Sequence, residues 1–457
     1  MRLPILAPAC LLLSLCACAP DGETPQPASS SPYSVRDGFV RDAEGRAVIL
    51  RGVNLSGMHK NAPYLDFHAP EDFRLVRDGL GMNSLRFLIE WSAVEPTRGA
   101  YDDAYLDAVR ERMDWARDAG LLVVLDMHQD LFGEGFAGGN GAPPWACDAA
   151  RYAAYEPSEM WFLGYLEENV VACFDGFWND TDLQDHYAKA YRHVAERLSD
   201  HPAIIGFDVM NEPWLGSYSI DDFEPRALQP FYERVVPQVR AAAPHWLAFL
   251  EPMSLSNLGR ATRLEPFPFD DVVYAPHSYD NSAEQGEGFD AAKRDGILTK
   301  LQTLKAEAHA LGAALWIGEY GGVADHPGIT PYMDAEYDAF ASVFAGSTYW
   351  DFSRGDGYGI SNADGSEKPA LWDVLVRPSP ERIAGTPGSW AYDETTGTFT
   401  LSWLAAGVAP SLVHVPARAY PAGFVVDVSG GSAVVDGADV AVSAEAGSDV
   451  VVVVRPL

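Results

Sequence analysis

Cysteine is scarce in this chain, and its distribution excludes most kinds of metal centre. The 457 residues contain 5 cysteines, of which Cys10, Cys16 and Cys18 lie in the first eighteen positions. No group of cysteines and histidines has the spacing of a structural zinc site, and no run of carboxylates resembles a calcium-binding loop. We therefore expect neither a metal ion nor an organic cofactor.

Basic side chains are also few. The sequence has 32 Lys and Arg residues against 65 Asp and Glu residues, which gives a formal net charge of −33. A surface this acidic repels phosphate polymers, so we expect no nucleic-acid partner. Acidity can reflect solubility alone, and it therefore says nothing about a substrate.

Long apolar runs are missing after the first eighteen residues. Arg2 is followed by an apolar stretch that continues through Leu15, and this pattern predicts a signal peptide over residues 1–18. The ending from Leu15 to Cys18 has the form of a bacterial lipobox, in which Cys18 would be acylated and become the mature N-terminus. An ordinary secretory signal is the alternative.

The segment 19–33 is rich in Pro, Ser and other polar residues, which is typical of a flexible tether. We expect an exported protein that is lipid-anchored to a bacterial membrane, or a secreted protein if the cysteine is not acylated. Stable anchoring needs more than one acyl chain, because a single chain binds a membrane only marginally.

Outside the signal peptide, Cys147 and Cys173 are the two remaining thiols. An even pair in an exported protein predicts a disulfide. The alternative is a pair of reduced, buried thiols.

Apolar patterning divides the chain into alternating strands and helices. Amphipathic helical patterns, for example over 104–120 and 183–200, separate short β-branched runs. Eight such strand and helix units predict a (β/α)8 TIM barrel over residues 34–376, with an active site at the C-terminal ends of the strands. The predicted strands are 47–55, 84–91, 121–129, 204–212, 246–253, 271–279, 314–322 and 347–352.

The pattern changes after residue 376. A segment rich in Pro and Gly, 377–388, precedes short alternating runs that predict an antiparallel β-sandwich over 377–457. We expect this domain to pack on the barrel in a structural role. A carbohydrate-binding or membrane-binding module is the alternative.

Two glutamates carry most of the functional signal. Glu212 ends the fourth predicted strand and Glu319 lies in the seventh, so both should face the barrel mouth. A glycosidase that retains anomeric configuration needs one carboxyl as acid and base and another as nucleophile, about 5 to 5.5 Å apart. The pair predicts this chemistry, and a structural salt bridge at each position is the alternative.

Polar and aromatic residues at the other strand ends should project into the same mouth. Arg86 could hold the nucleophile in its ionised form, His128 and Asp130 could bind sugar hydroxyls, and Trp350 offers a flat face to a pyranose ring. The alternatives are an internal ion pair for Arg86, and core packing for His128 and Trp350. The further candidates are His59, Lys60, Asp126, Asn211, His277 and Tyr279.

A long connection, residues 130–182, separates the third strand from its helix and is rich in aromatic side chains. Connections of this length in compact domains are generally functional, so the segment could form one wall of a cleft for a lipid tail. It could equally pack its aromatic rings into a small core of its own. Trp214 and Leu215, directly after the NEP motif, are better placed to contact the part of a substrate that leaves.

The motifs RGVNLSG, LDMHQD, GNGAPPWA, NEP, APHSYD, GEYGG and YWDFS resemble those of the retaining glycoside hydrolases of family 5, in their endoglycoceramidase-like branch. The resemblance spans about residues 48–360. It implies that Glu212 is the acid/base and Glu319 the nucleophile. The sugar site that it implies is lined by Lys60, Asp126, His128, Asn211, His277, Tyr279 and Trp350.

The resemblance further implies a retaining β-glycosidase that cleaves the bond between a glycan and ceramide in glycosphingolipids. We expect a glycolipid or oligosaccharide as substrate and a monomeric protein. Two alternatives remain. One is a β-glucanase or β-glucosidase that acts on other glycosides. The other is a non-catalytic surface lipoprotein that binds glycans.

Overall fold

The computed structural model describes residues 32–65, 67–284, 286–326 and 328–457. The predicted signal peptide with Cys18, and the predicted tether as far as residue 31, lie outside the described residues. Across the described residues, every helix is too short or too polar to cross a membrane.

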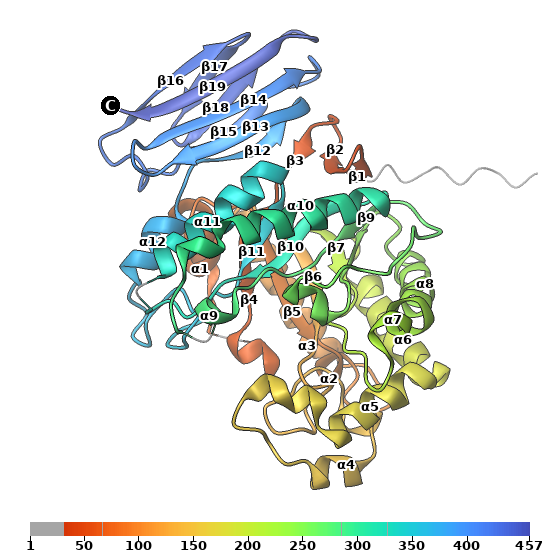
Figure 1. Ribbon diagram of the computed structural model, residues 1–457. Helices are drawn as coiled ribbons and strands as arrows, with labels where there is room; N and C mark the ends of the chain where they lie inside the picture. Colours follow the sequence, from red (N-terminus) through yellow and green to blue (C-terminus); the bar gives the residue numbers. More distant parts are fainter. Residues whose placement is uncertain (1–31, 66, 285, 327) are drawn as a thin grey trace, which may run out of the picture. The chain divides into compact units, whose positions relative to one another are not determined.

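A closed barrel of eight parallel strands forms the centre of the fold, and all eight predicted strands are confirmed (Figure 1). The strands follow one another around the barrel in chain order, and β11 closes it by pairing with β4. This order is that of a TIM barrel. The strands are β4 (Arg51–Leu55), β5 (Ser84–Glu90), β6 (Leu122–His128), β7 (Ile204–Asp208), β8 (Leu247–Leu250), β9 (Val272–Tyr274), β10 (Ala314–Tyr320) and β11 (Gly346–Tyr349).

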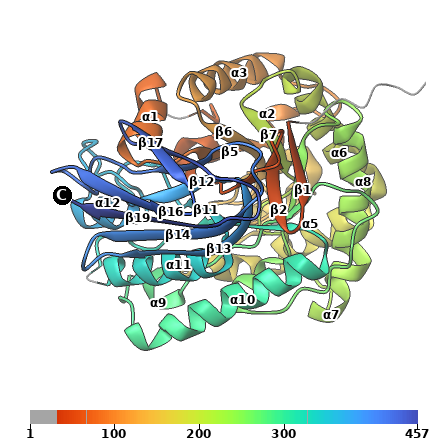
Figure 2. The same ribbon diagram turned by 90° about the horizontal axis from the view of Figure 1, so that it is seen from above.

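Amphipathic helices lie around the strands (Figure 2). The two predicted helices are α3 (Asp103–Asp118) and α6 (Thr181–Leu198), and each is capped by the aspartate that precedes it, Asp102 or Asp180. The other helices flanking the barrel are α1 (Pro70–Arg74), α2 (Trp91–Val94), α7 (Ile220–Phe223), α8 (Gln229–Arg240), α9 (Asn281–Glu284), α10 (Arg294–Ala310), α11 (Ile329–Val343) and α12 (Pro369–Leu375).

The long connection after β6 contains α4 (Ala149–Ala154), a 3-10 helix over Trp161–Leu166, and α5 (Glu168–Asn179). A disulfide joins Cys147 to Cys173, as predicted. The buried aromatic rings of the long connection do not form a separate core, because Phe132, Phe174 and Phe177 belong to the same apolar cluster as the barrel helices. Some rings of this connection therefore stabilise the barrel, and others stay exposed.

Two antiparallel sheets, built mainly from the C-terminal residues, share one apolar core that includes Phe399, Trp403 and Val440. This confirms the predicted sandwich. One sheet has the order β1-β2-β3-β12-β15-β18-β17 and the other β13-β14-β19-β16. The bounds are β12 (Ser379–Ile383), β13 (Gly385–Asp393), β14 (Thr398–Ala405), β15 (Ser411–His414), β16 (Phe424–Ser429), β17 (Ser432–Asp436), β18 (Asp439–Ser443) and β19 (Asp449–Pro456).

The domain limits differ from the sequence-based ones at the N-terminal side. The sequence predicts residues 34–48 as part of the barrel, but β1 (Tyr33–Arg36), β2 (Phe39–Asp42) and β3 (Ala47–Val48) belong to the larger sheet of the sandwich. The reason is that β3 pairs with β12, through Ala47 and Ile383, and so completes an edge that β12 would otherwise expose.

The same pairing shows where the two domains meet. Strand β3 leads directly into the N-terminal end of β4, and Phe344, just before β11, packs in the core of the sandwich beside Trp390. These contacts with the barrel lie at the N-terminal ends of its strands. The C-terminal ends carry both predicted catalytic glutamates.

Candidate active site

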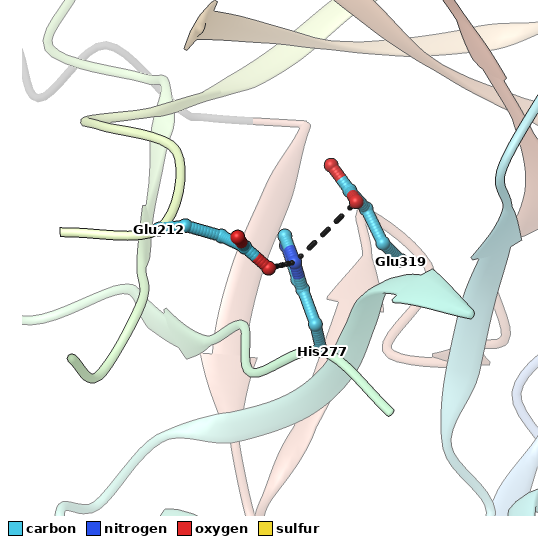
Figure 3. Close-up of side chains that lie close together, drawn as sticks. All are labelled: Glu212, His277 and Glu319. Carbon is cyan, nitrogen blue, oxygen red and sulfur yellow. Dashed lines mark hydrogen bonds and ion pairs between the residues drawn. The ribbon is translucent and has the colours of Figure 1, made fainter. Parts of the chain in front are cut away.

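Glu212 and Glu319 face one another at the C-terminal ends of β7 and β10, with His277 between them (Figure 3). One oxygen of each carboxylate and one nitrogen of His277 all lie within 4.8 Å of one another. The Nδ1 atom of His277 is 2.8 Å from Oε1 of Glu212 and 3.5 Å from Oε2 of Glu319. This separation fits a retaining pair, because inverting enzymes hold their carboxyl groups about 6.5 to 9.5 Å apart to admit a water molecule.

The backbone at Glu212 is strained, and its neighbours hold it. Glu212 has a φ of 40°, in the left-handed region that residues other than glycine seldom adopt. Its amide N–H donates to Oε2 of Glu251 at 2.9 Å, and the Gln129 side-chain amide donates to the Glu212 carbonyl at 3.1 Å. The surrounding structure therefore fixes the turn that carries the carboxylate into the barrel mouth.

Hydrogen-bond donors also fix the two carboxylates themselves. In Glu319, Oε1 accepts from Arg86 Nη1 at 2.6 Å and Oε2 accepts from the Tyr279 hydroxyl at 2.8 Å. In Glu212, Oε1 accepts from Asn257 Nδ2 at 2.6 Å and lies within hydrogen-bond distance of His277 Nδ1. Charge-assisted bonds of this kind are short and directional, so both groups are held in place before a substrate arrives.

Among the described residues, Glu212, His277 and Glu319 are also the one group of acidic, His and Cys side chains close enough to hold a metal ion. The hydrogen-bond donors around these three side chains do not suit a metal ion. The guanidinium of Arg86 lies against Glu319 and would repel a cation, and Asn257 and His277 already occupy Oε1 of Glu212. The arrangement fits the predicted acid and nucleophile.

Arg86 lies at the centre of a buried group of carboxylates below this pair. Its guanidinium forms ion pairs with four carboxylates, and it donates hydrogen bonds to the side chains of Asn54 and Asn211 as well. These carboxylates raise the pKa of Arg86, even though burial acts in the opposite direction. The four are Asp126 at 3.1 Å, Asp208 at 3.0 Å, Glu251 at 2.9 Å and Glu319 at 2.6 Å.

Replacing Arg86 by methionine is expected to destabilise the fold by about 3 to 5 kcal/mol, because it leaves buried carboxylates without their counter-charge. Urea unfolding monitored by fluorescence measures the effect. Arg110→Met is the matched control, since Arg110 pairs with Asp200 at the surface and such pairs contribute about 0 to 1 kcal/mol. Equal losses in the two variants would contradict the argument.

A second polar cluster lies beside the glutamates, on the side of β4, β6 and β11. Lys60 Nζ lies 2.7 Å from Asp130 Oδ2 and 4.3 Å from the centre of the Trp350 ring. His128 stacks on Trp350 with ring centres 5.5 Å apart, and its Nδ1 lies 2.7 Å from Asp126 Oδ2. A flat indole face and several charged hydrogen-bonding groups are the features that bind a sugar ring.

The charges in this second cluster support one another. Burial and the charge of Lys60 lower the pKa of His128. Asp126 and Asp130 raise it by more, so the net shift is upward. Burial acts to raise the pKa of Asp130, but Lys60 and His128 lower it below its usual range. These shifts favour the charged forms of Lys60, His128 and Asp130, which suits strong hydrogen bonds to sugar hydroxyls.

Three predicted residues are positioned differently from the rest. The Asn211 side chain accepts from Arg86 and donates to the Gln129 carbonyl, so its amide is committed to the protein. His59 is buried against Phe87, with ring centres 4.8 Å apart. Trp214 packs on Tyr165 of the long connection, with ring centres 5.2 Å apart.

Sequence reasoning missed five polar residues of the site. Glu251 directly follows β8 in the run LAFLEP and, like Glu212, is followed by a proline, so a signal for it was present. Glu90 ends β5, and both of its buried carboxylate oxygens lack a hydrogen-bond partner. Burial raises the pKa of Glu90 well above its usual range. The other three are Asn54, Asp208 and Asn257.

Glu336 on α11 supports the loop that carries His277 and Tyr279, because its carboxyl accepts from the Ser278 hydroxyl. Burial raises the pKa of Glu336 from 4.5 to about 7. The folded protein therefore keeps a proton that the unfolded chain has already released, and stability falls as the pH rises from about 4.5 to about 7. By linkage the loss amounts to about 3 kcal/mol.

The variant Glu336→Gln is expected to lose this pH dependence, and so to gain stability relative to the unmodified protein at pH 8 but not at pH 4. Urea unfolding midpoints at the two pH values measure the difference. Glu196→Gln, at an exposed position on α6, should leave the dependence unchanged. The same slope in the Glu336 variant would show that another group titrates.

Comparison with known proteins gives two family matches along the chain. Residues 41–356 match the model of cellulase, glycosyl hydrolase family 5. Residues 377–454 match the glycoside hydrolase family 5 C-terminal domain. The first match contains the barrel and both glutamates, and the second covers most of the sandwich.

Individual relatives agree with these matches. Endoglycoceramidase I of Rhodococcus hoagii is 31% identical over 421 residues, which are 85% of this chain and 81% of the relative. Among solved structures, endo-glycoceramidase II from Rhodococcus sp. in complex with ganglioside GM3 is 30% identical. It has a TM-score of 0.83 and covers 92% of this chain and 99% of its own. The lactosyl-enzyme intermediate of that protein matches with a TM-score of 0.82 at 30% identity, over 92% of this chain and 100% of its own.

Proposed function

The chain belongs to glycoside hydrolase family 5, and from this premise we propose that it hydrolyses the β-glycosidic bond between glycan and ceramide in glycosphingolipids, with retention of anomeric configuration. The observation that carries the proposal is the separation of Glu212 and Glu319, whose facing oxygens lie within 4.8 Å. The relatives named endoglycoceramidase support the substrate class.

In the first step, Glu319 attacks the anomeric carbon of the sugar that is linked to ceramide. Its oxygen forms a glycosyl–enzyme ester while the bond from the sugar to the ceramide oxygen breaks, and Glu212 gives its proton to that oxygen. Asn257 and His277 both bond to Oε1 of Glu212. We therefore assign the proton transfer to Oε2.

In the second step, Glu212 removes a proton from a water molecule, and the resulting hydroxide attacks the anomeric carbon from the face that ceramide has left. The ester bond to Glu319 breaks and its electron pair returns to the carboxylate. Two inversions at one carbon give net retention. Arg86 and Tyr279, which bond to Glu319 in the free protein, stabilise the carboxylate when it leaves.

The second polar cluster is proposed to bind the sugar next to the cleaved bond. Lys60, Asp130 and His128 supply hydrogen-bond donors and acceptors for its hydroxyl groups, and Trp350 supports its C–H face. Asp126 has a positioning role, because it bonds to Nδ1 of His128 and to Arg86.

The test is to incubate the protein with gangliosides, glucosylceramide, galactosylceramide and cellotetraose, and to identify the products by mass. The expected products are ceramide and an intact oligosaccharide, and NMR should show the β anomer first. Stepwise removal of terminal sugars, or faster cleavage of cellotetraose, would favour a β-glucosidase or β-glucanase. Binding without turnover of any compound would favour the glycan-binding alternative.

We also propose that the protein is exported and anchored to a bacterial membrane through acylated Cys18. The lipobox-like sequence before Cys18 and the polar segment 19–33 support this proposal. Metabolic labelling with a radioactive fatty acid should label the unmodified protein and not Cys18→Ser. Label in neither protein, with the unmodified protein recovered in the medium, would indicate a secreted enzyme instead.

A further inference from the structure

Four large apolar side chains lie exposed on one short segment of the long connection after β6. They are Met160 at 51% exposure, Trp161 at 46%, Phe162 at 47% and Leu166 at 64%. The segment is the 3-10 helix Trp161–Leu166 with the residue before it, and we call these four side chains the apolar ridge. Apolar side chains grouped in this way usually mark an interaction site.

The apolar ridge is held in place although it is exposed. The Trp161 indole N–H donates to the Gly138 carbonyl at 3.2 Å, and Gly164 and Tyr165, in the same 3-10 helix, are buried. The disulfide between Cys147 and Cys173 closes the chain around this segment. The exposed rings are therefore presented by a fixed backbone, which lowers the entropy cost of binding.

Ring contacts lead from the apolar ridge to the acid/base. Trp161 packs on Tyr165 with ring centres 5.7 Å apart, and Tyr165 packs on Trp214, two residues after Glu212, at 5.2 Å. Leu258, which is 65% exposed, follows Asn257, the residue that donates to Glu212. Exposed apolar groups thus lie close to the acid/base, and the acid/base is the residue that faces the departing group.

The charges around the apolar ridge select the kind of surface that it fits. The segment 152–188 contains no Lys or Arg, and Glu156, Glu159 and Glu168 are exposed beside the ridge. Binding to anionic lipids normally depends on basic residues, and these carboxylates would repel such lipids. The ridge therefore fits an apolar surface whose head groups are zwitterionic or uncharged.

We propose that the apolar ridge, together with Leu258, docks the protein on a lipid bilayer of zwitterionic or uncharged head groups, with Trp161 and Phe162 inserted at the interface. Tryptophan and phenylalanine prefer this region, where an apolar ring meets polar head groups. The second part rests on the proposed function: docking places the barrel mouth at the membrane, so the glycan enters the site while ceramide stays among lipids.

A binding experiment without any glycolipid tests the docking. The double variant Trp161→Ser/Phe162→Ser is sedimented with phosphatidylcholine vesicles, and all proteins carry Cys18→Ser so that no acyl chain binds the membrane. The loss of two interfacial rings is expected to weaken binding roughly tenfold or more. The matched control is Val434→Ser/Val435→Ser on β17, which removes two exposed apolar side chains elsewhere and should change nothing.

Cleavage rates on a water-soluble substrate and on a membrane-embedded substrate separate docking from catalysis. The ridge variant should cleave a water-soluble lactoside at the rate of the unmodified protein, which also shows that it is folded. It should cleave a glycosphingolipid embedded in phosphatidylcholine vesicles roughly tenfold more slowly, because fewer molecules reach the membrane. Equal rates on the embedded glycolipid, or equal vesicle binding, would overturn the proposal.

Two further results distinguish docking through the apolar ridge from docking through another surface and from dimerisation. Adding phosphatidylserine to the vesicles should weaken binding, and stronger binding that survives in the ridge variant would assign the docking to another surface. A dimer that dissociates in the ridge variant, with no vesicle binding by either protein, would mean that the ridge joins two copies of the chain. If vesicle binding needs the ridge but no glycolipid is cleaved, the proposed function fails and the docking stands.

Discussion

Glu319→Ala is expected to lower kcat on a glycosphingolipid by roughly 10⁴-fold or more, because the covalent intermediate can no longer form. The loss should be as large for a substrate with a good leaving group, since Glu319 acts on the carbon and not on the departing oxygen. Substrate binding should persist, because Lys60, Asp130 and Trp350 are unchanged. Single-turnover kinetics and a binding titration measure the two effects separately.

Sodium azide should restore part of this activity and reveal the role of the carboxylate. The alanine leaves space beside the anomeric carbon, and azide can attack there in place of the missing oxygen. A single displacement inverts the β substrate, so the product should be the α-glycosyl azide. Glu196→Ala, at an exposed position on α6, is the matched control and should keep full activity. A β-glycosyl azide from the Glu319 variant would mean that the two glutamates have the opposite roles.

The barrel could be predicted from sequence because its signal is local. Each strand is a short apolar run and each helix has its own amphipathic period, so all eight strands were found within a few residues of their true limits. The two glutamates proposed to be catalytic also have a local signal, since Glu212 and Glu319 lie at or just beyond the ends of such runs. The order of parallel strands then places them at one mouth.

The parts that could not be predicted depend on pairing between distant residues. Strand β3 is two residues long, and only its contact with β12, more than 300 positions later, makes it part of the sandwich. Glu90 and Asp208 are the last residues of β5 and β7 and have apolar neighbours on both sides, so nothing in the adjacent sequence distinguishes a functional carboxyl from an edge residue. The burial of Asp208 against Arg86, and that of Glu90 near Lys60, becomes evident only when the barrel is closed.

Arg86 connects the buried carboxylates to the two glutamates at the barrel mouth. Its guanidinium donates to Glu319 directly, and it also donates to Asn211, the residue before Glu212. Glu251 bonds both to Arg86 and to the amide of Glu212. One buried side chain is therefore linked to both glutamates, so their separation follows from the whole barrel and not from the two motifs alone.

Glu212→Ala is expected to lose activity to an extent that depends on the leaving group. For ceramide, whose alkoxide is a poor leaving group, the loss of the general acid should lower kcat/KM by roughly 10² to 10⁴-fold. An aryl glycoside with an acidic phenol needs no proton, so its first step should proceed almost normally. Comparing the two substrates in the same variant measures the effect, and equal losses on both would contradict the assignment.

In the Glu212 variant, azide should give a product of the opposite anomeric configuration from that of the Glu319 variant. Without a base to activate water, the glycosyl–enzyme formed from the aryl glycoside should accumulate, and mass spectrometry should detect the added glycan on the protein. Azide needs no base, so it should release the sugar rapidly. It attacks from the face opposite Glu319, and the two inversions give the β-glycosyl azide. An α product here would show that Glu212 is the nucleophile, whereas the β product requires that Glu319 has already formed its bond when the azide arrives.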